Sequence, residues 1–264
     1  MSPHPLTSIA AFARRDARVE ATHRLPYVID LLAVAAGVAV FYYLARFAGR
    51  GPGRGDLFPF VVAGLAVLRV NAALPRIVHR FEGEVALGSL AQLLSSRLSS
   101  AVVMAGEAAF ELLRGCVLGL FLVLLAAGLV EPDLHLGAVA VAGVLIGLAG
   151  AAVVSLGLAA GLTGLYLVLR LGLSLSALAT IAVPLLAGAY FPIDELPQPL
   201  HALATVLPFD DSVDIVRHAL LRGEIDAAAL ARLAAGAAIV LPLGFWTLHL
   251  GTRHSRRVGT LAIP

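Results

Sequence analysis

The chain has 264 residues, of which 59% are hydrophobic and 14% are charged, and its formal net charge is +2. Soluble domains carry about 25% charged residues, so this composition excludes an ordinary soluble protein. Several apolar runs of about 20 residues are long enough to cross a hydrocarbon core of about 30 Å as helices. Segments of about ten residues with alternating polarity, which a membrane β-barrel requires, are absent. The sequence predicts an all-α integral membrane protein.

All 19 basic residues are arginine. The phosphate-binding loop GxxxxGK[ST] needs a lysine that contacts the β- and γ-phosphates of a nucleotide. The chain therefore cannot carry that ATPase motif, and if ATP drives its function another subunit hydrolyses the ATP. Cys116 is the only cysteine, so no disulfide forms within the chain, and we expect a buried thiol that packs as a small hydrophobic group.

Residues 1–26 form a polar segment in which arginines gather. These are Arg14, Arg15, Arg18 and Arg24. On a helical wheel the first three lie broadly opposite an apolar group around Ile9 and Phe12, although Asp16 and Glu20 interrupt that group. This pattern predicts an interfacial helix in the headgroup plane, with a solvated tail as the alternative. The first apolar run is too long for the core of a signal peptide, so we expect no cleavable signal.

Six membrane spans are predicted. They cover residues 27–48, 57–75, 108–130, 137–162, 172–190 and 228–250. The fourth and fifth are divided at Arg170, because one helix over 137–190 would be far too long for a bilayer. Gly157, Gly161 and Gly164 predict close packing of the fourth span against a neighbour.

Arginine placement predicts the orientation of the spans. With six spans and both chain ends on one side, that side holds eleven arginines and the other side holds six. Cytoplasmic loops carry an excess of basic residues. We therefore expect both termini in the cytoplasm and residues 189–227 on the extracytoplasmic side.

Residues 79–100, HRFEGEVALGSLAQLLSSRLSS, form the first unusual segment outside the expected spans. A stripe of apolar residues follows helical spacing along it: Leu87, Leu90, Ala91, Leu94 and Leu98. This spacing predicts a short amphipathic helix on the cytoplasmic side. Such a helix would either dock on another protein or lie on the lipid surface. Its mixture of acids and bases suits an anionic leaflet poorly.

Residues 189–227 form the second unusual segment, in which prolines and acids interrupt the apolar chain. Leu200, Leu203 and Leu207 predict a short helix that Pro208 ends, and Asp210 or Asp211 is expected to cap a second helix in which Val213, Val216 and Leu220 share a face. Neither helix is long enough to span. Irregular backbone at membrane depth needs cover from protein or a water-filled cavity, so we expect two re-entrant helices that roof the outer end of the bundle.

The stretch GAYFPIDELPQPLHALATVLPFDDSVDIVRHALL resembles the signature of the ATP-binding cassette type-2 exporter permeases. The matching residues are Gly188, Phe191, Pro192, Leu196, Pro197, Leu207, Pro208 and Arg217. FARRD near the start, EGEVALGSLAQLL in the 79–100 segment and RHSRRVGTL at the end are also similar. The resemblance covers essentially the whole chain, with a distinctive outer segment and generic spans.

The resemblance implies one single-domain permease subunit, chain 1–264, of an exporter in the inner (plasma) membrane of a bacterium. Two permease chains, a homodimer or a heterodimer, would work with two copies of a separate ATPase subunit that binds ATP and Mg. The 79–100 segment would carry the coupling helix that docks on the ATPase. The contact residues that this implies are Arg80, Glu82, Glu84, Gly88, Leu90, Leu93 and Leu94, with Arg14 and Arg15 of the N-terminal helix beside them.

Polar residues inside the expected spans are functional candidates, because charge in hydrocarbon is costly. Arg69 and Asn71 in the second span and Phe41 and Tyr42 in the first are the possible substrate-path residues. Arg69 is also a candidate partner for Asp30, and the aromatic residues also suit an interfacial belt.

Glu107, Glu111 and Arg114 lie on one face at the start of the third span. We expect Glu111 and Arg114 to pair along the helix. An anchoring role, or contact with the coupling helix, is favoured over a proton relay, which would need acids at mid-membrane.

Two other functions compete with the exporter. An intramembrane metalloenzyme would need a cluster of ligands, but HExxH is absent and the histidines are scattered, so no metal site and no catalytic residue are expected. An ion-coupled secondary transporter would favour internal repeats and broken helices near the midplane, and no convincing repeat is present. The terminal arginines, which membrane topology already explains, give no support for nucleic-acid binding.

Overall fold

The computed structural model describes residues 5–22, 25–48, 57–86, 99–129, 134–169, 172–190 and 193–258. Within these ranges the chain is helical and has no strand, which confirms the all-α fold class. The elements are α1 (Pro5–Thr22), α2 (Leu25–Ala48), α3 (Leu57–Asn71), α4 (Ala73–Ala86), α6 (Ser100–Leu129), α7 (Ala138–Leu169), α8 (Gly172–Leu186), a 3-10 turn (Ile193–Glu195), α9 (Gln198–Val206), α10 (Phe209–Arg222) and α11 (Ala227–Val258).

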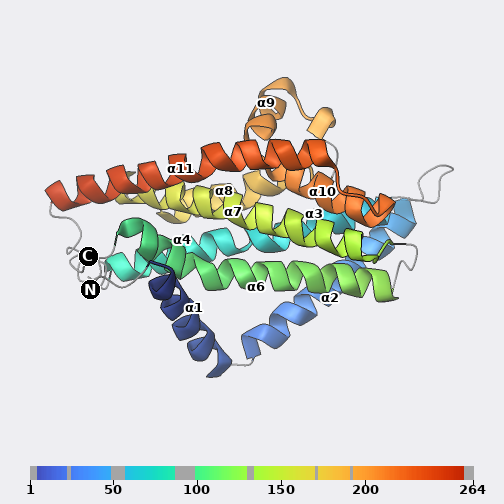
Figure 1. Ribbon diagram of the computed structural model, residues 1–264, viewed down its shortest axis with the longest axis horizontal. Helices are drawn as coiled ribbons and strands as arrows, with labels where there is room; N and C mark the ends of the chain where they lie inside the picture. Colours follow the sequence, from blue (N-terminus) through green and yellow to red (C-terminus); the bar gives the residue numbers. More distant parts are fainter. Residues whose placement is uncertain are drawn as a thin grey trace.

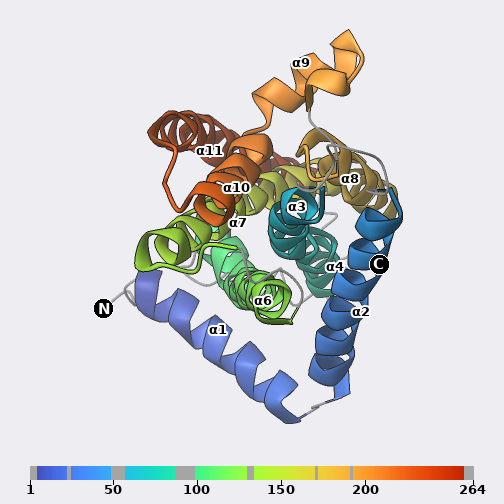
Figure 2. The ribbon, with the colours of Figure 1, turned by 90° about the vertical axis from the view of Figure 1, so that its right-hand side faces the viewer.

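The long helices run side by side along the longest axis of the molecule (Figure 1). α7 lies within this bundle and packs against α3, α4, α6, α8, α10 and α11. α1 and α2 cross the bundle obliquely and form a V on one side of it, whereas α9 projects from the other side (Figure 2). The described part of α9 therefore does not cover the end of the bundle as the predicted roof would.

Within the described residues, five helical stretches are long and apolar enough to cross a membrane. They are Leu25–Phe47, Phe58–Val85, Ser100–Leu129, Ala138–Leu169 and Ala227–Arg257. The fifth expected span, 172–190, forms α8, which has 15 residues and is therefore about 22 Å long, less than the thickness of a hydrocarbon core. A multi-pass helical protein is confirmed, and the count of six spans stays a prediction.

The second span does not end at residue 75 as expected. α3 continues through the single turn residue Ala72 into α4, which reaches Ala86. Pro75 does not interrupt this path because it lies in the first turn of α4, where a backbone N–H would have no helical partner. The 79–100 segment therefore begins inside a long helix. Residues 87–98 lie outside the described residues, and with them the predicted contact residues Gly88, Leu90, Leu93 and Leu94.

Three other helices extend beyond the predicted bounds of their spans. α6 begins at Ser100 instead of residue 108, α7 reaches Leu169 instead of 162, and α11 reaches Val258 instead of 250. Polar residues near these ends belong to the helices, because their side chains can pair with neighbours or solvent while the helical backbone hydrogen bonds continue. The expected division between the fourth and fifth spans is confirmed, since α7 ends at Leu169 and α8 begins at Gly172.

α7 and α11 pack with their backbones in contact. A Cβ atom added at Gly244 of α11 would collide with the carbonyl oxygen of Gly157, and one added at Gly251 would collide with that of Gly164. Close approach at small residues is how helices associate in membranes. The predicted packing role is confirmed for Gly157 and Gly164. Gly161 is looser, because a Cβ atom there would lie 3.6 Å from Thr247 Oγ1, an ordinary contact.

Candidate functional sites

Six charged residues of α1, α4 and α6 pair with one another, and we call them the α1–α4–α6 network. They are Arg15, Asp16, Arg76, Arg80, Glu107 and Glu111. Glu111 accepts hydrogen bonds from Arg76 Nε and Arg80 Nη2, both at 2.7 Å. The carboxylate of Glu111 is 1% exposed, so two arginines compensate a charge that is almost fully removed from solvent.

The same network reaches α1. Arg80 Nη1 donates to Asp16 Oδ2 at 2.6 Å, and Arg15 Nη2 donates to Glu107 Oε1 at 2.8 Å. Asp16 and Glu107 are also buried. Asp16, which was expected to interrupt the apolar face of the N-terminal helix, is the residue through which this helix pairs with α4. Arg80 therefore bridges α1 and α6 at the start of the 79–100 segment.

These contacts correct two expectations about pairing and support a third. Glu111 pairs with α4, and Arg114 donates to Asp30 of α2 while its guanidinium carbon lies 4.8 Å from the centre of the Tyr27 ring. The expected pair within α6 is therefore wrong, and Arg114 takes Asp30 in place of Arg69. The acids of α6 anchor neighbouring helices, as favoured from the sequence.

The predicted ATPase-contact residues divide into two groups in the structure. Arg15 and Arg80 direct their guanidinium groups into the α1–α4–α6 network. Arg14 is exposed, Glu84 is half-buried, and Glu82 lies 3.0 Å from the Nδ1 atom of His79. Arg76 and Asp16 were missed from the sequence, because only the three-dimensional arrangement places them beside Glu111 and Arg80.

Two residues of the resemblance signature meet at the turn after α8. Gly188 has a φ of +60°, a left-handed conformation that glycine adopts without strain. Its carbonyl oxygen accepts a hydrogen bond from Arg217 Nη2 at 3.2 Å. Arg217 also donates to Asp214 at 2.7 Å, and its guanidinium carbon lies 3.6 Å from the centre of the Phe60 ring. α10 thus fixes this turn against α3.

The remaining signature residues lie around the same segment. The carbonyl of Pro197 accepts the backbone N–H groups of Leu200 and His201, and the backbone N–H of Leu196 donates to Ile193. Pro208 stands before α10, where a Cβ atom added at Gly236 of α11 would lie 2.6 Å from its ring. Phe191 and Pro192 lie outside the described residues.

The start of α10 carries three aspartates, which with Arg217 and Arg232 form the α10 cluster: Asp210, Asp211 and Asp214. The expected side-chain cap is wrong: Pro208 occupies the N-cap position, and Asp210 and Asp211 lie in the first turn, where the helix dipole favours negative charge. Burial, and then the nearby charge of Asp214, raise the pKa of Asp210 to about 7. The predicted apolar face of α10 is confirmed, because Val213, Val216 and Leu220 are buried.

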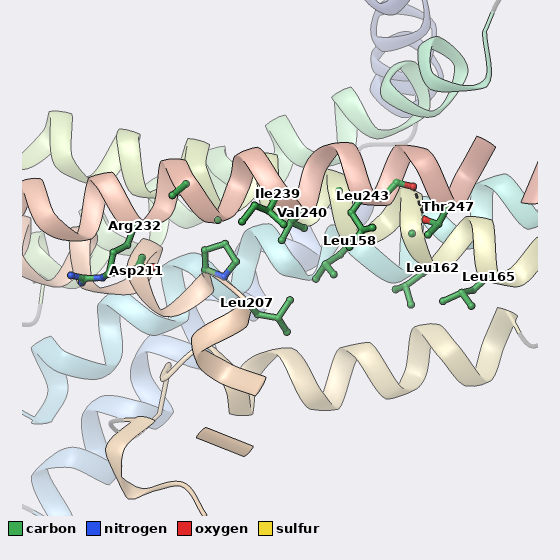
Figure 3. Close-up of a pocket in the computed structure, with 16 residues that line it drawn as sticks. Leu158, Leu162, Leu165, Leu207, Asp211, Arg232, Ile239, Val240, Leu243 and Thr247 are labelled. Carbon is green, nitrogen blue, oxygen red and sulfur yellow. Dashed lines mark hydrogen bonds and ion pairs between the residues drawn. The ribbon is translucent and has the colours of Figure 1, made fainter. Parts of the chain in front are cut away.

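A large apolar cleft of about 620 Å³ lies between α7 and α11 (Figure 3). Leu158, Leu162, Ile239 and Leu243 are among its lining side chains. At one end Arg232 Nε donates to Asp211 Oδ1 at 2.7 Å, so the charged groups of this cleft already neutralise each other. An apolar compound or a lipid chain suits such a surface.

A second cavity, of about 360 Å³, lies between α2, α3 and α8 and is called here the Arg69 cavity. Three of the four predicted substrate-path residues, Phe41, Arg69 and Asn71, line it. Tyr42 is not among its lining residues and instead packs edge-on against the rings of Phe58 and Tyr43. Asn71 accepts the hydroxyl of Ser155 at 2.7 Å.

No protein-family model and no curated protein matches the sequence. Among the described residues, no group of three or more His, Cys, Asp or Glu side chains is placed to hold a metal ion.

Proposed function

We propose that this chain is the membrane subunit of an ATP-driven exporter of the ATP-binding cassette type. It moves an amphipathic drug-like compound, a lipid or a lipid-linked molecule outward by alternating access. The multi-pass helical fold supports this proposal. Because the lysine-free sequence cannot carry the phosphate-binding loop, ATP would be hydrolysed by another subunit. Two ATPase subunits and a second permease copy complete the complex, which resides in the plasma membrane of a bacterium with both termini of this chain in the cytoplasm.

The observation that carries the proposal is the α1–α4–α6 network. The 79–100 segment begins in α4, and Arg80, the second residue of the segment, pairs with Asp16 of α1 and Glu111 of α6. Separating these pairs would leave buried carboxylates without partners, which costs several kcal/mol. A push by the ATPase on this segment would therefore move α1 and α6 together with α4.

The turn held by Gly188 and Arg217 supports a second part of the proposal. It lies at the other end of α8 from the α7–α8 break, beside the α10 cluster. A gate needs a turn that has a defined closed arrangement, and the hydrogen bond of Gly188 with the stacking of Arg217 on Phe60 supplies one. We propose that this turn closes the exit path.

Purification of the tagged chain from its host membranes in detergent tests the proposal. The measurements are ATP hydrolysis and the amount of bound ATPase by mass spectrometry. We compare wild type with Glu84→Arg plus Leu90→Asp, and use Glu224→Arg, an exposed acid before α11, as the matched control. Wild type and control are expected to retain a stoichiometric ATPase that the double variant loses.

Failure of the wild-type chain to bind any ATPase contradicts the proposal. The ion-coupled transporter then becomes the function to pursue, and Asp210 is the first group to examine because its pKa of about 7 allows protonation near neutral pH.

A further inference from the structure

We propose that the Arg69 cavity binds the headgroup of an anionic amphiphile, with a phosphate or carboxylate paired to Arg69 and the apolar chain against Phe41, Leu65 and Val183. That this amphiphile is exported rests on the proposed function, whereas the binding itself does not.

The charge of Arg69 is the first argument. This half-buried guanidinium lies within the candidate span Phe58–Val85. Within the described part of the chain it makes one hydrogen bond, to the carbonyl of Ala33 at 3.3 Å, and no ion pair. The nearby carboxylate of Asp30 accepts from Arg114. A cation at membrane depth is costly unless it pairs, so an anionic ligand stabilises it.

Other arginines of the bundle show the contrast. Arg15, Arg76, Arg80, Arg114, Arg217 and Arg232 each lie within hydrogen-bond distance of a carboxylate. The chain therefore pairs arginines with acids at both ends of the bundle, but within the described residues it places no acid at hydrogen-bond distance from Arg69. Among the half-buried arginines of the described residues, Arg69 is the one without a carboxylate at hydrogen-bond distance, so its charge is available to a ligand.

The lining of the cavity is the second argument. Its residues include Thr180 and Tyr190 as polar groups, together with apolar side chains of α2, α3 and α8, and none of them is acidic. Tyr190 stacks on Phe41 with a centroid distance of 5.8 Å, which gives one wall an aromatic surface. A volume of about 360 Å³ is within the range of small-ligand sites. A single positive charge without acids selects anions and rejects cations.

The position of the guanidinium is the third argument. A Cβ atom added at Gly37 of α2 would lie 3.2 Å from Arg69 Nη2, so the Arg69 side chain packs against α2 at this glycine. A larger residue at this position would press on the guanidinium, so glycine lets the charged group lie here. The cleft between α7 and α11 differs, because its arginine is already paired with Asp211 and cannot select a headgroup by charge.

Equilibrium binding of radiolabelled dodecyl phosphate to the full chain in dodecyl maltoside tests this proposal, with dodecyltrimethylammonium as the cationic probe. Loss of a charge-assisted hydrogen bond costs roughly 1.5–3 kcal/mol, so Arg69→Gln is expected to weaken dodecyl phosphate binding about 10- to 140-fold. Arg69→Lys is expected to retain binding within a few-fold. Arg253→Gln, an exposed arginine of α11 outside the cavity, is the matched control and should bind as wild type.

A cavity-filling variant tests the same cavity without changing Arg69, so its result does not depend on whether the Arg69 variants fold correctly. Ala179→Leu adds volume at the α8 wall and leaves the charge unchanged, so it should also weaken binding. Equal binding by wild type and Arg69→Gln, or equal binding of the cationic probe, overturns the proposal. The ATPase plays no part in this assay, so its outcome is separate from that of the exporter proposal.

The occupant is either a membrane lipid or a free amphiphile, and nanodiscs distinguish the two. If phosphatidylglycerol nanodiscs weaken dodecyl phosphate binding relative to phosphatidylcholine nanodiscs, and Arg69→Gln removes that difference, the lipid headgroup occupies the site. If binding depends on Arg69 equally in both nanodiscs, a free anionic amphiphile occupies it. Binding that is independent of Arg69 in both nanodiscs contradicts the proposal.

Discussion

The two charged regions of the bundle differ in how closely arginines pair with their carboxylates. In the α1–α4–α6 network, each of the three acids has an arginine nitrogen within 3.0 Å. In the α10 cluster, three aspartates share Arg217 and Arg232, and the pKa of Asp210 rises to about 7. The first region links three helices through these ion pairs. In the second region Asp210 changes its charge near neutral pH, so carboxylates and arginines link helices in one place and include a titratable group in the other.

Removal of Glu111 is expected to have the largest effect. Glu111→Ala leaves Arg76 and Arg80 without this buried partner, and breaking a buried ion pair costs roughly 3–5 kcal/mol. Thermal stability in detergent, followed by the monodisperse peak in size-exclusion chromatography, should fall by many degrees. Glu224→Ala, at an exposed acid, should stay near wild type. Equal stability of the two variants would show that the network does not hold the helices.

Gly188→Ala is expected to have the next effect, at the turn beside the α10 cluster. An alanine in the left-handed region costs roughly 1–2 kcal/mol, and its Cβ atom would also lie 2.5 Å from Asp210 Oδ1. The Tm should fall by a few degrees. Gly128→Ala in α6 is the control, because a Cβ atom there meets nothing within 4 Å. A Tm for Gly188→Ala as high as that of the control would argue against the observed turn.

The pH dependence of the α10 cluster is expected to give a smaller effect. The pKa of Asp210 is about 7 in the folded protein and 3.8 ordinarily, so the folded state binds more protons between these values. Stability from this group therefore falls as the pH rises through that window. Wild type should have a higher Tm at pH 6 than at pH 8, and Asp210→Asn should reduce the difference. A variant with the wild-type pH profile would assign the titration to another group.

Arg232→Gln should have the smallest effect. Its side chain is 56% exposed, and exposed ion pairs contribute about 0–1 kcal/mol. Its Tm should lie within about 2 °C of that of wild type at neutral pH. A large loss of stability would mean that the α10 cluster depends on this pair as strongly as the other network depends on Glu111.

Hydrophobic runs predicted the long helices because the composition of a span is a local property. Their ends were less predictable. The second span was expected to end at residue 75, yet α4 continues through Arg80, Glu82 and Glu84 to Ala86, and Arg80 pairs there with acids of α1 and α6. A single sequence does not contain that information, because the partners lie far apart in the chain.

The candidate sites also contain residues that the sequence identifies and a pairing that it does not. Phe41, Arg69 and Asn71 were selected because they are polar or aromatic residues within spans, and the structure places all three around one cavity. The pairing of Arg114 with Asp30 was not predictable, because spacing along one helix favoured Glu111 instead. Helical spacing identifies neighbours on a helix, but it does not determine which helix lies opposite.

The most direct test of the exporter account is the side of the membrane on which each charged region lies. In a Cys116→Ser background, Glu84→Cys reports on the start of the 79–100 segment and Glu224→Cys on the loop after α10. A membrane-impermeant maleimide added to intact cells should label Glu224→Cys, and it should label Glu84→Cys only after the cells are permeabilised. Labelling of Glu84→Cys in intact cells would place the 79–100 segment outside the cytoplasm, where no ATPase could drive it, and would contradict the exporter account.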